Sequence, residues 1–166
     1  MNHRILVVDD TEEIHDLFTF ILQSMEKQVS PNKLESKIDD ILAGTETSEQ
    51  ACEGLKFKID HAFQGEQALN MIDKAHQSNE PYSLVYMDVR MPPGIDGIET
   101  IKRAREKYPE QEFVICTAFN NYEWEELFKL FGHNDKILYM SKPFCDTSLK
   151  QMTNYILTKV QKSLES

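Results

Sequence analysis

Cysteine, proline, glycine and tryptophan are all scarce in this sequence, which has 3, 6, 6 and 1 of them among 166 residues. The cysteines (Cys52, Cys116 and Cys145) are odd in number and far apart, which excludes a disulfide framework and a paired metal-binding spacing. No apolar run approaches the roughly 18 residues of a membrane-spanning helix, and the first residues lack the apolar stretch of a signal peptide. We therefore expect a soluble, cytoplasmic protein that does not bind membranes.

Positive charge is scarce as well. The chain has 18 Lys and Arg against 28 Asp and Glu, a net charge of −10. Phosphate backbones and anionic lipid surfaces are bound by clustered Lys and Arg, so this balance argues against nucleic acid and membrane partners. The length suits a single domain that buries a core without disulfides or structural metals.

Short apolar runs alternate with helical patterns along the chain. We predict strands at 4–9, 57–62, 82–88, 112–117 and 136–140. Apolar residues recur at helical spacing in the segments after them, which predicts helices at 10–22, 65–76, 97–108, 122–131 and 147–164. The run at 57–62 alternates apolar and polar residues, as in a half-exposed strand near a sheet edge. Strict alternation predicts an α/β fold, a (βα)5 doubly wound parallel five-stranded sheet.

One polar segment, at about 26–55, interrupts this alternation between the first helix and the second strand. We interpret it as an insertion, and two interpretations remain open. It is either a solvated excursion that the surface tolerates or a docking or oligomerisation element specific to one partner. The last helix, at about 147–164, continues in a manner that suits a connection to a further domain of a longer protein.

Acidic and basic side chains follow the predicted strands. Asp9 and Asp10 end the first strand, Asp88 ends the third, Thr117 ends the fourth, and Lys142 follows the fifth. The carboxyl ends of parallel strands meet at one edge of the sheet, where such folds bind ligands. Three adjacent carboxylates repel one another unless a cation neutralises them, and an all-oxygen ligand set favours Mg²⁺. These residues predict a phosphoryl site at which Asp88 forms an acyl phosphate.

Four motifs at these strand ends resemble a known family. They are DD at 9–10, D-x-x-M-P-x-x-x-D-G at 88–97, TA at 117–118 and K-P-F at 142–144. Together they resemble the receiver domain of bacterial two-component response regulators, with its CheY-like, flavodoxin-like fold. The resemblance covers the whole of 1–166 except about 26–55.

The resemblance implies a phosphorelay function with roles for individual residues. Asp88 would accept a phosphoryl group from a histidine kinase or a phosphotransfer protein. Asp10 and Asp88 would bind Mg²⁺ directly, Asp9 mainly through water, and Arg90 through its backbone carbonyl. Lys142 would pair with a phosphoryl oxygen. The chain would be a phosphoacceptor switch, and its only reactions would be its own phosphorylation and autodephosphorylation.

The resemblance also implies how the signal leaves the site. Thr117 would bind the phosphoryl group and Tyr139 would turn inward with it, while Pro143 would follow a cis peptide bond. An output domain or partner protein would then bind the face built from 122–131, 136–140 and 147–164. A homodimer also stays open.

Other functions remain to be weighed. Arg90 and Phe119 lie two residues after Asp88 and Thr117, where bulky side chains predict slow autodephosphorylation. A phosphohydrolase with an Asp nucleophile is the main competitor, but it would place an acid where Arg90 stands. The chain could also be a receiver module from a hybrid histidine kinase or another multidomain regulator. A degenerate receiver that only binds partners would have lost Asp10, Asp88 or Lys142, and all three are present.

The remaining polar residues receive structural interpretations. We expect Asp10 to cap the first helix, with Glu13 completing a capping box. Cys116 lies in a predicted buried strand, so we expect a core residue. The histidines are far apart in the sequence, and we expect surface positions for all of them, namely His3, His15, His61, His76 and His133. The aromatic residues of 122–131 could belong to the core or to an exposed partner surface.

Overall fold

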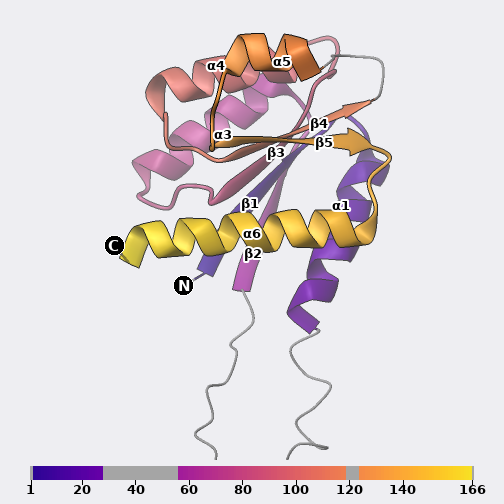
Figure 1. The fold of residues 1–166 in the computed structure, drawn as a ribbon, viewed down its shortest axis with the longest axis vertical. Helices are drawn as coiled ribbons and strands as arrows, with labels where there is room; N and C mark the ends of the chain where they lie inside the picture. Colours follow the sequence, from indigo (N-terminus) through magenta and orange to yellow (C-terminus); the bar gives the residue numbers. More distant parts are fainter. Residues whose placement is uncertain (1, 28–55, 119–123, 166) are drawn as a thin grey trace, which may run out of the picture.

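The computed structural model describes residues 2–27, 56–118 and 124–165. They contain a five-stranded sheet made of β1 (Asn2–Val8), β2 (Lys56–Ala62), β3 (Leu84–Asp88), β4 (Phe113–Ala118) and β5 (Ile137–Lys142). The strand order is β2-β1-β3-β4-β5, and all neighbouring strands are parallel (Figure 1). The predicted doubly wound sheet is therefore confirmed, and each strand overlaps the range expected for it.

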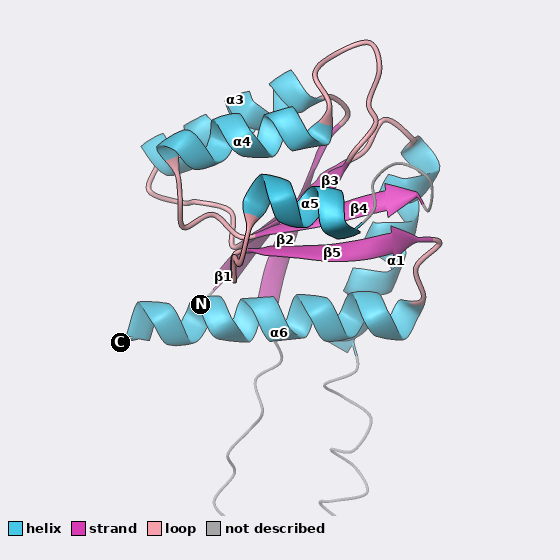
Figure 2. Ribbon diagram, turned by 45° about the horizontal axis from the view of Figure 1, so that its top comes forward, coloured by secondary structure: helices cyan, strands magenta, loops and turns pink. Residues whose placement is uncertain are grey.

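The helices of the described segments cover both faces of this sheet. They are α1 (Glu12–Lys27), α3 (Gly65–Gln77), α4 (Gly97–Lys107), α5 (Trp124–Phe131) and α6 (Asp146–Glu165). Figure 2 shows α1 and α6 on one face and α3, α4 and α5 on the other. Among these helices, none combines the length and the apolar character needed to cross a bilayer.

Burial along each strand follows from its place in the sheet. The central strands β1, β3 and β4 are continuous apolar runs because helices cover both of their faces. The edge strand β2 has the alternating sequence KFKIDHA, and most of its side chains are partly or fully exposed. The sheet thus divides the apolar interior into two layers, one under α3, α4 and α5 and one under α1 and α6.

The first helix begins later than the sequence suggests. It starts at Glu12, which makes Thr11 the residue before the helix, so the prediction of Asp10 as its cap is wrong. The backbone N–H of Thr11 donates to Asp9 Oδ1 at 2.9 Å, while the Asp10 carboxylate accepts the Thr11 hydroxyl at 3.3 Å. Asp10 is exposed at the end of the strand.

That helix also runs to Lys27, so the first two positions of the predicted insertion are helical. The rest of that segment, residues 28–55, lies outside the described residues, as do Cys52, Phe119 and Tyr122. The start of α4 follows expectation. Asp96 precedes the helix, and its Oδ1 accepts from the backbone N–H of Glu99 at 2.8 Å, an N-cap bond.

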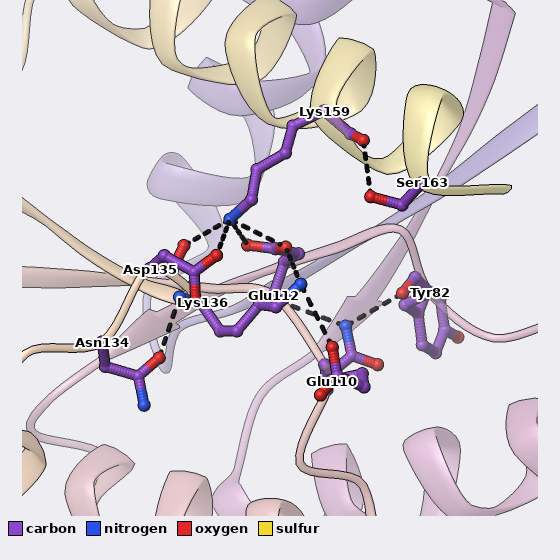
Figure 3. A network of polar contacts seen from close by, with 9 residues as sticks. Tyr82, Glu110, Glu112, Asn134, Asp135, Lys136, Lys159 and Ser163 are labelled. Atoms are coloured by element: carbon purple, nitrogen blue, oxygen red, sulfur yellow. Dashed lines mark hydrogen bonds and ion pairs between the residues drawn. The ribbon is translucent and has the colours of Figure 1, made fainter. Parts of the chain in front are cut away.

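A hydroxyl pair and an ion pair join α6 to the strands of the sheet and the segment before β4. In the interior, the hydroxyls of Tyr86 on β3 and Thr153 on α6 lie 2.6 Å apart, and both side chains are buried. Near the C-terminal part of the helix, Lys159 Nζ lies 3.1 Å from Oε1 of the buried Glu112 (Figure 3). Lys136 Nζ lies 3.2 Å from the same oxygen, so one buried carboxylate is shared by two ammonium groups.

Candidate functional site

The carboxyl ends of the strands bring the predicted site residues to one edge of the sheet. Asp9 follows β1, Asp88 ends β3, Thr117 lies near the end of β4, and Lys142 ends β5. The strand order reverses between β1 and β3, since β2 lies on one side of β1 and the later strands lie on the other. This reversal is where open α/β sheets bind their ligands.

Three carboxylates meet at this point. Oxygen atoms of Asp9, Asp10 and Asp88 all lie within 4.8 Å of one another. Asp9 is 2% exposed and Asp88 is 8% exposed, whereas Asp10 is open to solvent. A purely carboxylate set with one open side fits a hard divalent cation that keeps several waters, which is the preference of Mg²⁺.

Lys142 bridges two of these acids. Its Nζ donates to Asp9 Oδ2 at 2.5 Å and to Asp88 Oδ1 at 2.9 Å. Burial alone would lower the pKa of Lys142, but the hydrogen bonds to Asp9 and Asp88 outweigh it and the pKa lies above its usual value. The side chain therefore stays an ammonium group in this site.

Asp88 has the opposite balance. Burial raises the pKa of its carboxyl above the usual range, and the charges of Asp9 and Asp10 add to this. The hydrogen bond from Lys142 lowers the pKa but does not cancel the effect of burial. A carboxylate that is poorly solvated and crowded by like charges gains from a cation or from a reaction that removes its charge.

The backbone after Asp88 is closely packed. A Cβ atom on Gly97 would lie 2.0 Å from the carbonyl oxygen of Asp88, so only glycine allows α4 to begin here. The Gly97 N–H donates to the carbonyl of Val89 at 2.9 Å. Further along the loop, Gln64 Oε1 accepts from Gly94 N–H at 3.3 Å. The start of α3 and the start of α4 thus hold the segment that follows Asp88.

Thr117 lies on β4, the strand next to β3 and Asp88, and Tyr139 lies on β5, on the other side of β4. Thr117 follows Cys116, which pairs in register with Asp88, and its hydroxyl donates to the carbonyl of Ala118 at 3.0 Å. Tyr139 on β5 is half-buried against the apolar layer under α3, α4 and α5, and burial raises the pKa of its hydroxyl. Both occupy the strand positions that the resemblance assigns to a switch.

The remaining site predictions have mixed outcomes. The peptide bond between Lys142 and Pro143 is cis, as expected. Cys116 is buried in the core, also as expected. Arg90 is exposed, and its backbone carbonyl remains a predicted metal ligand. Phe119 lies outside the described residues, so its place beside the site also stays a prediction.

The prediction that all the histidines lie on the surface is wrong. His3 is 2% exposed and His15 is 4% exposed. The ring of His15 lies 2.8 Å from the backbone carbonyl of Asp9 through Nε2 and 2.8 Å from Nδ1 of His61 through Nδ1. Helical periodicity could have placed His15 inside, because it precedes the buried Phe18 and Leu22 by three and seven positions.

Comparison with known proteins identifies the family. The response regulator receiver domain matches residues 36–154. This span contains Asp88, Thr117 and Lys142, whereas Asp9 and Asp10 precede it and reach the same site through β1. No curated protein matches the sequence.

Solved structures with the same fold come from several organisms. One is the signal receiver domain of a Vibrio parahaemolyticus protein described as a Luxo repressor, with a TM-score of 0.68 and 14% identity over 98% of this chain and 95% of that one. Another is a CheY-like response regulator receiver domain from Methanospirillum hungatei, with a TM-score of 0.64 and 22% identity over 98% and 99%.

A third similar structure is NtrX from Brucella abortus in complex with ATP, with a TM-score of 0.64 and 22% identity. The match covers 99% of this chain but only 29% of NtrX. At 14% and 22% identity, these three structures show only that the fold is the same. The family match over most of the chain goes further and shows that this chain belongs to the family of response regulator receiver domains.

Proposed function

We propose that Asp88 accepts a phosphoryl group from a phosphohistidine of a histidine kinase or a phosphotransfer protein, in a reaction that depends on Mg²⁺. One observation carries this proposal. Three carboxylates lie within 4.8 Å of one another, and one ammonium group bridges two of them, at the switch point of a receiver fold. This arrangement places a nucleophile, a cation site and a fixed positive charge together.

The transfer is a displacement at phosphorus. A carboxylate oxygen of Asp88 attacks the phosphorus atom, a new O–P bond forms, and the bond from phosphorus to the imidazole nitrogen of the donor breaks. The electron pair of that bond leaves with the imidazole. Lys142 already contacts Asp88 Oδ1, so its ammonium lies where it can bind a phosphoryl oxygen. Mg²⁺ held by Asp10 and Asp88, by Asp9 through water and by the Arg90 carbonyl would supply further positive charge.

The phosphoryl group then changes a binding surface. We propose that Thr117 moves to bind it and that Tyr139 turns further into the core, which shifts an existing equilibrium between two conformations. The surface affected is built by α5, β5 and α6, and its partner would be an output domain or a separate protein. NtrX, which is much longer than this chain, is an example of a similar fold within a longer protein.

The direct test is intact mass after incubation with acetyl phosphate and Mg²⁺. We expect a gain of one phosphoryl group in the unchanged chain, and none in Asp88→Asn or when EDTA removes the metal. Asp73→Asn is the matched control, since this half-buried acid on α3 pairs with Lys107 away from the site. It should gain the same mass as the unchanged chain. Mass gain in Asp88→Asn would overturn the proposal.

The lifetime of the phosphoryl group is a separate expectation. Arg90 and Phe119 are bulky residues two positions after Asp88 and Thr117, where they would shield the phosphoryl group from attacking water. We expect slow autodephosphorylation, which Arg90→Ala should accelerate. Following the decay of the phosphorylated mass with time measures this, and a half-life of seconds in the unchanged chain would refute it.

A further inference from the structure

His61, His15 and the backbone of Asp9 are linked by two consecutive contacts, the second of which reaches the acidic site. His15 of α1 lies between the backbone of Asp9 and the ring of His61, which comes from the edge strand β2. Its Nε2 lies 2.8 Å from the Asp9 carbonyl oxygen, and its Nδ1 lies 2.8 Å from His61 Nδ1. The His15 side chain is buried, and Phe63 lies against it with ring centroids 4.3 Å apart.

Hydrogen-bond chemistry assigns the protons on the rings of His15 and His61. A carbonyl oxygen only accepts, so His15 Nε2 carries the proton of that bond. A neutral His15 then has a lone pair on Nδ1, and a contact of 2.8 Å between the two Nδ1 atoms needs one proton, which must belong to His61. Burial, and then the neighbouring His15, lower the pKa of His61, which favours the neutral form of the His61 ring. With His15 neutral, His61 is thus expected as the Nδ1–H tautomer. The Thr19 hydroxyl, 3.5 Å from His61 Nε2, then forms no hydrogen bond with it, because that hydroxyl donates to the His15 carbonyl at 2.8 Å.

The bond to the carbonyl completes the restraint of Asp9. Its N–H donates to the carbonyl of Ala62 at 3.2 Å, its Oδ1 accepts from Thr11 N–H, and its Oδ2 accepts from Lys142. The carbonyl that His15 holds belongs to the peptide group that joins Asp9 to Asp10. Fixing the orientation of this peptide plane therefore fixes the position of the Asp10 Cα atom, from which the exposed carboxylate leaves the backbone.

We propose that His15 is a positioning residue for the cation site, and that His61 holds it in the tautomer that this role requires. His15 acts through the peptide group and touches neither the cation nor the phosphoryl group. The inference rests on the proposed function, because it assumes that Asp10 binds Mg²⁺. Outer contacts of this kind commonly change metal affinity by about 10- to 100-fold when they are removed.

The first test needs no variant. Long-range ¹H–¹⁵N correlation spectra of the unchanged, ¹⁵N-labelled chain at pH 7 report which ring nitrogen of each histidine carries its proton. We expect Nε2–H for His15 and Nδ1–H for His61, the tautomer that is less populated for a histidine free in water. Finding Nε2–H on both residues would overturn the inference, because the two Nδ1 atoms would then repel each other.

The second test measures Mg²⁺ affinity by isothermal titration and the Mg²⁺ dependence of phosphorylation. His15→Phe removes the donor and keeps a ring of similar size, and we expect about a tenfold weaker Mg²⁺ affinity. The phosphorylation rate at saturating Mg²⁺ should fall much less than the affinity. His15→Gln keeps an N–H donor and should restore part of the affinity. The matched control is His76→Phe, whose ring stacks on Tyr108 of another layer and should leave Mg²⁺ affinity unchanged.

The outcomes separate the two ideas. If the unchanged chain binds Mg²⁺ and His15→Phe binds it equally well, the positioning role is refuted and the proposed function stands. If the unchanged chain neither binds Mg²⁺ nor gains a phosphoryl group, the proposed function fails and the inference fails with it. Should His15→Phe not fold, His61→Phe on the edge strand takes its place, with a smaller loss of affinity expected and no loss refuting the role.

Discussion

Asp88 is an acid whose charged form the folded chain disfavours. Burial raises the pKa of its carboxyl above the value of 3.8 expected without the fold. An acid with a raised pKa in the folded state favours folding while it is protonated. That contribution is fully present below the unfolded pKa and is lost as the pH rises through the folded pKa. At neutral pH the ionised Asp88 therefore lowers the free energy of unfolding.

Replacing this charge should stabilise the fold. We expect Asp88→Asn to raise the free energy of unfolding at pH 7, and the gain to shrink as the pH falls toward 3.8. Urea denaturation at several pH values measures it. Asp73→Asn should behave in the opposite way, because the hydrogen bond from Lys107 lowers the pKa of Asp73. A lower stability of Asp88→Asn than of the unchanged chain at pH 7 would contradict the argument.

The buried hydroxyl pair of Tyr86 and Thr153 makes a second prediction for single residues. The Thr153 hydroxyl donates to the carbonyl of Leu149 at 2.7 Å, so Tyr86 must donate to Thr153. Thr153→Val keeps the shape but leaves the Tyr86 hydroxyl without an acceptor, at a cost of about 1–3 kcal/mol. The double variant Tyr86→Phe with Thr153→Val removes both partners and should recover part of that loss. Urea denaturation of the four proteins of this cycle tests it, and independent, additive losses would refute it.

At the scale of helices and strands, buried parallel strands are easy to recognise in a sequence. The segments ILVV and LVYM are continuous apolar runs that end in acids, so they reveal both the strand and the edge at which its side chains meet. The strand ends determine which residues converge, which is why Asp9, Asp88 and Lys142 could be brought together without a structure. Thr117 followed from the same argument.

Contacts that depend on rotation and register could not be predicted in this way. His15 and His61 are 46 positions apart. Their contact requires the register that pairs Val7 with His61 and the rotation of α1 that turns His15 inward. The predicted start of α1 also differs from the observed one, because Asp10 and Thr11 both have the chemistry of a cap and the sequence does not choose between them. Helix starts are where sequence patterns are least exact.

The shared carboxylate of Glu112 yields a prediction for the attachment of α6 (Figure 3). Lys159→Met leaves Lys136 to neutralise Glu112, so we expect a loss of about 1 kcal/mol in the free energy of unfolding. Changing both lysines to Met leaves a buried charge without a partner, and the loss should reach about 3–5 kcal/mol. Urea denaturation measures both, with the exposed Lys58→Met as the control.

Adding Glu112→Gln to that double variant removes the unpaired charge and should restore much of the lost stability. If the double variant loses only the sum of two small single losses, the shared carboxylate does not couple α6 to the sheet.

On the scale of the whole molecule, negative charge dominates. The net charge is −10, and three of the acids lie close together at the strand ends. A ligand that binds only the folded chain raises its stability, by about 2.7 kcal/mol when its concentration is 100 times Kd. We therefore expect Mg²⁺ to raise the midpoint of urea denaturation beyond what NaCl of equal ionic strength achieves.

Asp10→Asn separates the specific effect of Mg²⁺ from general screening. This variant removes one exposed carboxylate of the site and should lose most of the stabilisation by Mg²⁺ while it keeps the response to NaCl. Equal responses to the two salts in the unchanged chain would show that the ion acts only by screening.

The bond from Lys142 to Asp9 joins residues that are 133 positions apart. In biosynthesis the three acids emerge long before the lysine that neutralises two of them. Among the described strands, β5, which carries this lysine, comes last along the chain and lies at the edge of the sheet beside β4. A nascent chain that stops short of β5 would present its acids without their counter-charge. The cluster of acids and lysine is therefore completed by the last of the described strands along the chain.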